Sequence, residues 1–258
     1  MAQETRYGSM RKRDFLLVIF IVAGIFIHNQ REAAGLYEGK IFREDFSSEE
    51  LSPSVWGIST FSLYNFKASP DMVSNSSGIN YLRLGLPVSN GIYPTGFIYT
   101  NDHFSYGSYS ARIKVSDMPG VIASFFACTE IKDIFTTGTH DEIDFELITA
   151  NPHAVSLTTW KMATEKEGKY QTPNHISYLW ENPSFDIREW HVYRFDWFPD
   201  KVGFYIDGIK VWTSTIAIPQ KPMQIALHIF THATWKEVRF PPKGEAVQVT
   251  DWVEYRKF

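Results

Sequence analysis

The sequence predicts an all-β fold, a sandwich or barrel of antiparallel strands in one large domain. Beyond residue 40 the apolar residues recur with a period of two rather than about 3.6, which is typical of strands that bury one face. Turn signals separate these strands, and the sequence contains no convincing long amphipathic helix, repeat or low-complexity linker. Aromatic residues make up 16% of the chain, and strands favour aromatic side chains. Together these observations favour two packed antiparallel sheets.

The N-terminal region predicts export. Three basic residues, 11–13, precede an apolar run over 15–27. This run is short for a membrane-spanning helix, which needs about 20 residues, but it fits the hydrophobic part of a signal peptide. An uncleaved signal anchor and a buried core helix are the alternatives. We therefore assign 1–35 to a signal peptide or signal anchor and 36–258 to the folded domain, and we expect a secreted or cell-surface protein.

The clearest strands follow in order along the rest of the chain. Polar and apolar residues alternate over 108–115, as expected of a half-buried strand. A second strand is predicted over 191–197, and a turn leads it into 202–206. Asp207-Gly208 then marks a two-residue hairpin before 209–212. One face of a later strand is formed by Met223, Ile225, Leu227 and Ile229, and its other face by Gln224, Ala226, His228 and Phe230.

Composition and charge exclude several classes of protein. Hydrophobic residues make up 44% and charged residues 21% of the 258 residues, which argues against long disordered regions. The formal net charge of −4 argues against a nucleic-acid partner, because nucleic-acid binders normally carry a basic patch. The single cysteine, Cys128, excludes an intramolecular disulfide and a cysteine-based zinc cluster.

The segment 140–147 carries the most chemistry. Alternation along a strand places Glu142, Asp144 and Glu146 together on one face and sends the apolar residues between them to the core. Neighbouring carboxylates repel each other, so at least one pKa is expected to rise while another group stays ionised. Acid/base work on a glycosidic bond requires such a split. A solvated acidic strand edge and a calcium site are the alternatives.

These residues carry a resemblance to a known family. Glu142-Ile143-Asp144-Phe145-Glu146 resembles the E-x-D-x-E signature of glycoside hydrolase family 16. Flanking segments are similar to that family as well, namely 104–109 with Arg112 and Lys114, 123–126, 191–197 through 205–208, and 251–255. The resemblance covers 41–258. It implies a concanavalin A-like β-jelly-roll sandwich of two antiparallel sheets, with a glycan cleft across one sheet and a retaining mechanism.

The resemblance also implies roles for the three acids. Glu142 corresponds to the nucleophile, Glu146 to the acid/base, and Asp144 to a helper between them. The five-residue spacing resembles the lichenase and xyloglucan-transglycosylase branch of the family rather than the laminarinase branch. The implied function is a retaining endo-acting β-glycanase, similar to an endo-β-1,3-1,4-glucanase, with a polysaccharide as substrate.

Two other functions remain open on the same scaffold. One is a transglycosylase that remodels cell-wall glycan, in which a sugar hydroxyl replaces water in the second step. The other is a non-catalytic lectin, which the intact set of three acids disfavours because binding alone has no need of clustered carboxylates.

The predicted lining of the cleft departs from the lichenase pattern. By position, lichenases have Trp at His140, Asn and Tyr near Thr158 and Trp160, and Asn-x-Trp where this chain has His228 and Phe230. A packed core tryptophan is the alternative for Trp160, and a structural sheet histidine is the alternative for His228. The predicted substrate-binding residues are Trp160, His228, Phe230, Phe126, His140 and Thr158.

Cofactors and assembly are predicted in the same way. The two-carboxylate reaction requires no cofactor. Asp251 corresponds to a calcium-ligand position in some relatives, so it is a weak candidate for a structural calcium site. We expect a monomer that contacts a membrane only through an uncleaved N-terminal anchor.

Overall fold

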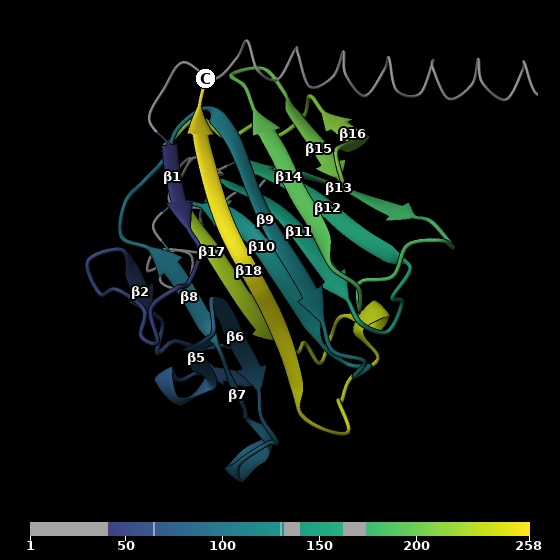
Figure 1. Ribbon diagram of the computed structural model, residues 1–258. Helices are drawn as coiled ribbons and strands as arrows, with labels where there is room; N and C mark the ends of the chain where they lie inside the picture. Colours follow the sequence, from purple (N-terminus) through teal and green to yellow (C-terminus); the bar gives the residue numbers. More distant parts are fainter. Residues whose placement is uncertain (1–40, 64, 130, 132–139, 162–173) are drawn as a thin grey trace, which may run out of the picture. The chain divides into compact units, whose positions relative to one another are not determined.

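The computed structural model describes residues 41–63, 65–129, 131, 140–161 and 174–258 (Figure 1). The predicted signal peptide or anchor over 1–35 lies outside these residues. Within the described part of the chain, no helix is long and apolar enough to cross a membrane. Strands dominate this part, and its named helical elements are short 3-10 turns: η1 (Pro70–Met72), η2 (Ser89–Gly91) and η3 (Lys236–Val238).

The strands form two sheets, as the alternation of apolar residues predicted. The larger sheet has eleven strands, and its described pairings are antiparallel except for β4 with β7. Its path runs through β16 (Ile209–Ser214), β15 (Val202–Ile206), β14 (His191–Trp197), β9 (Gly107–Val115), β18 (Ala246–Lys257), β6 (Ile79–Leu84), β7 (Tyr93–Thr95), β4 (Phe66–Ala68) and β3 (Ser62–Leu63). Two further strands join it at the side, β1 (Ile41–Glu44) beside β18 and β5 (Val73–Ser76) beside β6.

The smaller sheet has seven strands, all paired antiparallel, and it carries the three acids. Its order is β13 (Asn174–Glu181), β12 (Ala154–Lys161), β11 (Glu142–Ile148), β10 (Ile122–Cys128), β17 (Gln224–Phe230), β8 (Phe97–Thr100) and β2 (Trp56–Ile58). The acidic strand β11 is therefore flanked by two strands on one side and four on the other. This position holds its backbone by hydrogen bonds on both edges.

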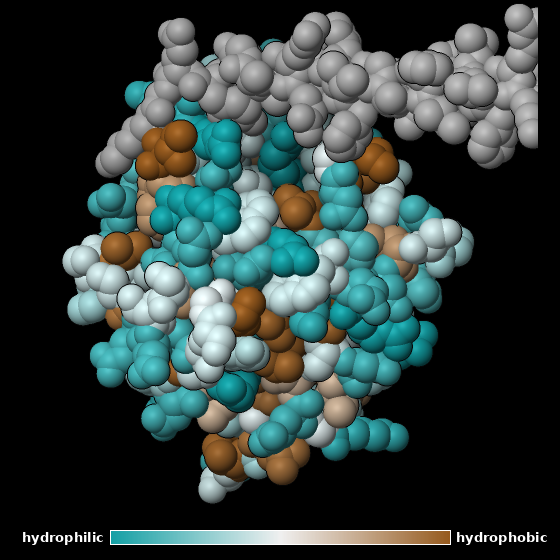
Figure 2. Space-filling view, in the orientation of Figure 1, coloured by the Kyte–Doolittle hydropathy of each residue, from teal (hydrophilic) through white to brown (hydrophobic). Residues whose placement is uncertain are grey.

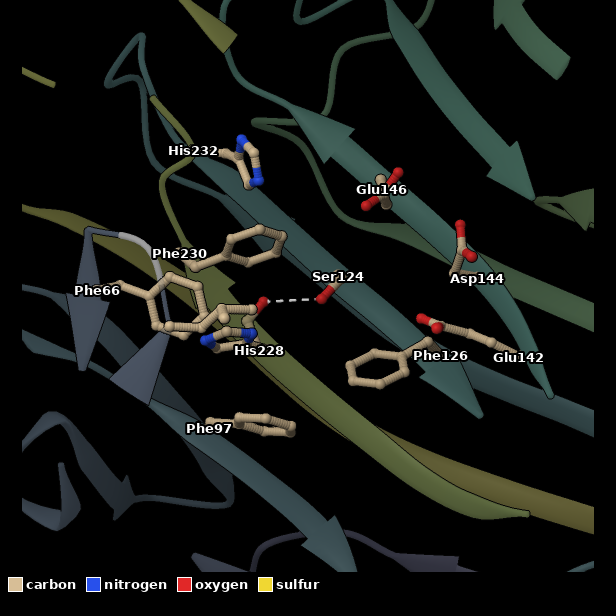
Figure 3. Close-up of a pocket in the computed structure, with 11 residues that line it drawn as sticks. Phe66, Phe97, Ser124, Phe126, Glu142, Asp144, Glu146, His228, Phe230 and His232 are labelled. Atoms are coloured by element: carbon tan, nitrogen blue, oxygen red, sulfur yellow. Dashed lines mark hydrogen bonds between the residues drawn. The ribbon is translucent and has the colours of Figure 1, made fainter. Parts of the chain in front are cut away.

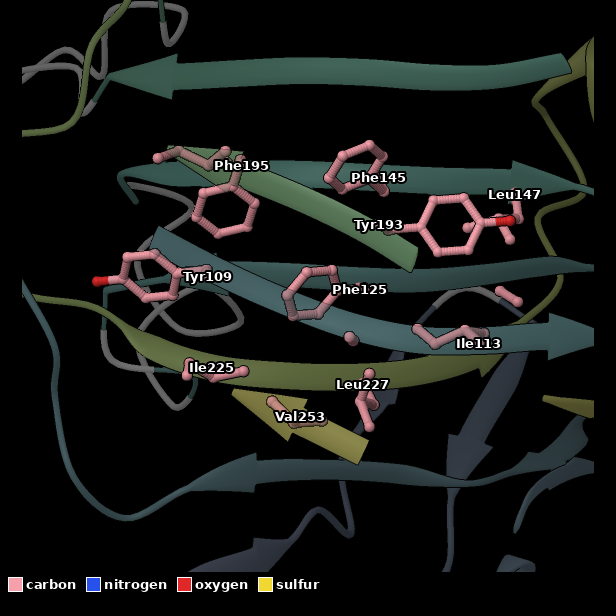
Figure 4. Close-up of a cluster of buried hydrophobic side chains, with 14 of the residues drawn as sticks. Tyr109, Ile113, Phe125, Phe145, Leu147, Tyr193, Phe195, Ile225, Leu227 and Val253 are labelled. Atoms are coloured by element: carbon pink, nitrogen blue, oxygen red, sulfur yellow. The ribbon is translucent and has the colours of Figure 1, made fainter. Parts of the chain in front are cut away.

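The core lies between the two sheets and is built largely from aromatic rings (Figure 4). Tyr109 on β9 stacks on Phe195 of β14, with ring centroids 4.7 Å apart. From the smaller sheet, Phe125 on β10 stacks on Phe145 of β11 at 6.2 Å and on Phe195 at 5.6 Å. Aromatic pairs of this kind add stabilisation beyond the area that they bury. The high aromatic content thus serves mainly the packing of one sheet on the other.

The strand signals read from the sequence are confirmed in detail. Asp207 and Gly208 both have positive φ, 51° and 79°, which the two-residue turn between β15 and β16 requires. Ile143, Phe145 and Leu147 are fully buried between the sheets. The opposite face of the larger sheet is turned away from the core, and hydrophilic side chains cover much of the view in Figure 2. Apolar residues inside and polar residues outside are what period-two alternation encodes.

Candidate active site

The three acids lie on the face of β11 that is turned away from the core. This face is called the pocket face below. Each acid is paired with one residue on β10 and one on β12, so the site is built from rows that cross the strands. The rows are Ser124–Glu146–Ser156, Phe126–Asp144–Thr158 and Cys128–Glu142–Trp160. Successive residues of a strand point to opposite faces, so the three acids occupy every second position of β11.

The first row continues onto the strands beyond β10. Ser124 is paired with His228 on β17, and His228 is paired with Phe97 on β8. The Ser124 hydroxyl donates a hydrogen bond to the His228 carbonyl oxygen at 3.1 Å, as drawn in Figure 3. One line of side chains therefore runs from the aromatic side of the sheet to Glu146.

The three acids, with Ser124 and Phe126 on β10, line one side of a pocket of about 150 Å³. Figure 3 shows the carboxylates on one side of it and aromatic rings on the other. The lining consists of Leu63, Phe66, Phe97, Ser124, Phe126, Glu142, Asp144, Glu146, His228, Phe230 and His232. The cavity is thus half acidic and half aromatic, and the boundary between the halves runs along β10.

Burial shifts the pKa values of two of the three acids. It raises the pKa of Glu146 to about 8, and the negative charge of Glu142 adds to the rise. It also raises the pKa of Asp144 well above its ordinary value, and the charges of Glu146 and Glu142 contribute. The Thr158 hydroxyl and the Trp160 indole oppose this rise. Glu146 and Asp144 therefore hold their protons at a pH where an exposed carboxyl is ionised, which gives the site a proton donor.

Glu142 has a charged partner of its own. Nε2 of His140 lies 2.6 Å from Oε2 of Glu142, and both side chains are largely buried. Burial disfavours the imidazolium, but the charges of Glu142 and Asp141 and the hydrogen bond to Glu142 outweigh it and raise the pKa of His140. The Glu142 carboxyl and the His140 ring thus form a close, largely buried pair.

His228 has the opposite environment on the aromatic side of the pocket. Its ring stacks between Phe97 at 4.3 Å and Phe230 at 4.6 Å, and the edge of Phe66 approaches at 5.0 Å. Burial alone lowers the pKa of His228 to about 3. Burial therefore favours the neutral imidazole at this position.

The structure brings only some of the predicted substrate-binding residues into the pocket. Phe126, His228 and Phe230 line it directly. Thr158 and Trp160 lie beside the acids on β12, and Trp160 does not belong to the core between the sheets. The Thr158 hydroxyl shares a hydrogen bond with Ser177 at 3.0 Å. The remaining predicted residue, His140, contacts Glu142 outside the lining set.

Sequence reasoning missed five residues of the lining. Ser124 and His232 could have been predicted from the sequence. Alternation puts Ser124 on the face of Phe126, and His232 follows Phe230 by two positions. Leu63, Phe66 and Phe97 come from β3, β4 and β8. The first two belong to the other sheet, and no local pattern links them to the acidic strand.

Asp251, the calcium candidate, has a different partner. It lies at a bulge in β18, where the register opposite β9 shifts between Thr250 and Trp252. Its Oδ2 accepts a hydrogen bond from Nη1 of Arg112 at 2.5 Å. Among the described residues, no group of three His, Cys, Asp or Glu side chains is arranged to hold a metal ion. In this arrangement the Arg112 guanidinium balances the charge of the Asp251 carboxylate.

Comparisons with known proteins agree with this geometry. The family model described as glycosyl hydrolases family 16 matches residues 62–253. A beta-glucanase of Acetivibrio thermocellus is 28% identical over 232 residues, which cover 88% of this chain and 64% of that protein. The chain thus spans just under two thirds of this relative's length. A xyloglucan endotransglycosylase/hydrolase protein 8 of Oryza sativa subsp. japonica is 28% identical over 174 residues, 64% of this chain and 54% of the relative.

Solved structures show the same architecture. The beta-glucanase of Bacillus licheniformis superposes with a TM-score of 0.72 at 24% identity, and the match covers 86% of this chain and 100% of that one. At this identity the likeness shows the fold, a jelly-roll sandwich of two sheets. The fold class predicted from the sequence is therefore confirmed.

Proposed function

The chain belongs to glycosyl hydrolases family 16, and we propose that it is a retaining, endo-acting β-glycanase of the endo-β-1,3-1,4-glucanase type. The observation that carries the proposal is the unequal pair on β11. Burial raises the pKa of Glu146 to about 8, whereas Oε2 of Glu142 lies 2.6 Å from Nε2 of His140. A retaining glycosidase needs one carboxylic acid and one carboxylate that flank the scissile bond.

The residues divide the reaction into two displacements. In the first, Glu142 attacks the anomeric carbon, the glycosidic C–O bond breaks, and Glu146 gives its proton to the leaving oxygen. In the second, Glu146, now ionised, takes a proton from water, and the water oxygen displaces Glu142 from the sugar. Both steps invert the anomeric carbon, so the product keeps the β configuration. Asp144 lies between the two on the strand, and its raised pKa suits a group that shares a proton with a neighbour.

The pocket lining supports a neutral glycan as substrate. Its aromatic half contains Phe66, Phe97, Phe126 and Phe230 together with the neutral ring of His228. Pyranose rings present flat C–H faces that pack on such rings. An anionic sugar would meet three acids and no cation among the lining residues. Relatives named beta-glucanase favour a β-glucan within the neutral class.

Transglycosylation is the second candidate, and a specific finding supports it. The rice relative carries the name of an endotransglycosylase/hydrolase. The same two carboxylates would serve, with a sugar hydroxyl in place of water in the second displacement. The two reactions differ in the acceptor that reaches the glycosyl-enzyme, water or a sugar hydroxyl. Analysis of the products therefore distinguishes them.

Further proposals concern the setting of the enzyme. We propose a secreted or cell-surface monomer that acts without a cofactor and without nucleic acid, and that touches a membrane only if the segment 1–35 is retained. N-terminal sequencing of the extracellular protein tests the export proposal, and a start between residues 28 and 40 is the expected result. Full-length protein in the cytosol would contradict it.

A substrate panel tests the function itself. Reducing ends are measured after incubation with mixed-linkage glucan, laminarin, xyloglucan and a galactan, and we expect the fastest release from mixed-linkage glucan. The first anomer seen by NMR is expected to be β. Products longer than the substrate in the presence of added oligosaccharide would favour transglycosylation. Binding to a glycan without any cleavage would make the protein a lectin and overturn the proposal.

A further inference from the structure

His140 lies two residues before Glu142, at the point where the chain enters β11. Its Nε2 is 2.6 Å from Oε2 of Glu142, and the side chains are 14% and 18% exposed. An ionised carboxylate can only accept a hydrogen bond, so Nε2 carries the proton. This holds for the charged imidazolium and for the neutral tautomer alike. The contact is a charge-assisted hydrogen bond with a defined direction.

The ring of His140 is held in place from the neighbouring strands. The Trp160 ring lies 5.7 Å from it, and Trp160 stacks in turn on His175 with centroids 4.1 Å apart. The strand register explains this row, because Trp160 on β12 is paired with both Glu142 and His175. The stacked pair of Trp160 and His175 therefore packs against one side of the imidazole beside Glu142.

His140 makes no other described hydrogen bond. Its Nδ1 is buried and has no hydrogen-bond partner among the described residues. Burying such a donor or acceptor without a partner costs stability, so a purely structural role would be expected to use both nitrogens. The geometry instead commits the ring to one oxygen of one carboxylate.

We propose that His140 is a positioning residue that binds Oε2 of Glu142 and leaves Oε1 free to attack the anomeric carbon. This inference rests on the proposed function, in which Glu142 is the nucleophile. A glutamate side chain has three rotatable bonds, and fixing one oxygen by a hydrogen bond removes most of that freedom. Precise alignment of the reacting atoms is a large part of enzymatic rate enhancement. Asp144, Glu146, Cys128, His175 and His228 are further titratable groups on the pocket face.

Covalent labelling isolates the step in which His140 would act. The probe is 2-deoxy-2-fluoro-β-laminaribiosyl fluoride, a disaccharide whose fluoride leaves without needing a proton from Glu146. Oε1 of Glu142 forms a bond to the anomeric carbon while the C–F bond breaks and fluoride departs with the electron pair. His140 keeps its proton throughout. The intact mass of the protein reports the rate, and peptide mapping reports the labelled residue.

Two substitutions separate the hydrogen bond from the shape of the ring. His140→Leu keeps bulk but has no donor, whereas His140→Gln places an amide N–H at a similar reach. We expect His140→Leu to label Glu142 about tenfold more slowly at saturating probe, with a half-saturating concentration within about twofold of the original. His140→Gln should recover most of the rate. His103→Leu, an exposed histidine outside the pocket lining, is the matched control.

The outcomes distinguish this inference from the proposed function. Equal labelling rates for His140→Leu and the original protein would overturn the inference, as would a His140→Gln variant as slow as His140→Leu. If His140→Leu does not fold, His140→Asn replaces it, because its amide is one methylene too short to reach Oε2. Failure of the original protein to label on Glu142, or labelling elsewhere, would contradict the proposed function instead.

Discussion

His140 and His228 lie on the same sheet and on opposite sides of one pocket, yet their charges differ. Burial works against the charged ring in both. At His140 the Glu142 carboxylate outweighs burial and raises the pKa, whereas at His228 burial acts alone and lowers the pKa to about 3. A buried ring is therefore neutral unless a partner of opposite charge lies within hydrogen-bond distance.

The same contrast divides the pocket into a reactive half and a binding half. Around β11 the charge of Glu142 contributes to the raised pKa values of His140, Asp144 and Glu146. Around β17 the phenyl rings of Phe97 and Phe230 stack on His228 and disfavour its charged form. Chemistry is thus confined to one wall, and the other wall offers flat apolar surface. Four predictions test this division, and a fifth concerns the charge pair of Asp251 and Arg112 outside the pocket lining.

Removal of Glu142 should have the largest effect. Glu142→Gln takes away both the nucleophile and the charge that raises the pKa of His140 and Glu146. We expect turnover of polysaccharide and of activated aryl glycosides to fall by more than about 10⁴-fold, as is typical when a nucleophile is lost. Glu254→Gln, a buried acid on β18 paired with Arg256, is the control and should retain activity. Residual turnover within about tenfold of the original would show that Glu142 is not the nucleophile.

Removal of Glu146 should have the next largest effect, and it should depend on the leaving group. General acid catalysis contributes about 10²–10⁴-fold, so Glu146→Gln should lose that factor on polysaccharide and much less on an activated aryl glycoside. Added azide should restore the second step by replacing the water that Glu146 activates. A β-glycosyl azide formed by Glu142→Gln instead would exchange the two roles.

Glu146 also gives a prediction for stability. Its pKa is raised from 4.5 to about 8 in the folded protein, so between these values the folded state binds more protons than the unfolded state. Stability from this group therefore falls as pH rises through the window. Asp144 acts in the same direction. We expect the melting temperature of Glu146→Gln to fall less than that of the original protein between pH 5 and pH 8, and an equal fall would contradict the raised pKa.

Much of the fold and the acidic wall could be predicted from the sequence because both depend on local alternation. Glu142, Asp144 and Glu146 occupy one strand, and a period of two fixes their common face without knowledge of other strands. The aromatic wall is different. Phe66 and Phe97 reach the pocket from β4 and β8, and only the assembled sheets bring them to His228. Long-range topology of this kind leaves no signal in the neighbouring residues.

The roles of single residues were harder still to predict. His140 was expected to bind substrate, and the structure places it against Glu142, which lines the pocket. Its direction depends on the stacked rings of Trp160 and His175, which belong to two other strands. Asp251 was a calcium candidate from its position alone, and the nearby guanidinium of Arg112 could not be read from that position.

His228 should affect stability in acid rather than turnover chemistry. Its pKa is lowered from 6.5 to about 3, so between these values the unfolded state binds the extra proton and stability falls as pH falls. His228→Phe keeps an aromatic ring between Phe97 and Phe230 and removes that proton. We expect the variant to lose less melting temperature than the original protein between pH 7 and pH 4. His103→Phe, at an exposed histidine, is the control. If His228→Phe and His103→Phe lose equal amounts of melting temperature over this pH range, His228 is not buried in its neutral form.

The smallest effect is expected at Asp251, where a charge pair lies near solvent. Its carboxylate and the Arg112 guanidinium are 29% and 37% exposed, so water screens their attraction, and such pairs contribute about 0–1 kcal/mol. Arg112→Met should therefore lower the melting temperature only slightly.

Because the guanidinium balances Asp251, we expect a chelator to leave the melting temperature of the original protein unchanged. In Arg112→Met the carboxylate loses this partner, and added calcium should stabilise the variant more than the original protein if Asp251 can bind the ion at all. A large stabilisation of the original protein by calcium would show that Arg112 gives way to the metal, and the pairing in the structure would then be only one of two states of this bulge.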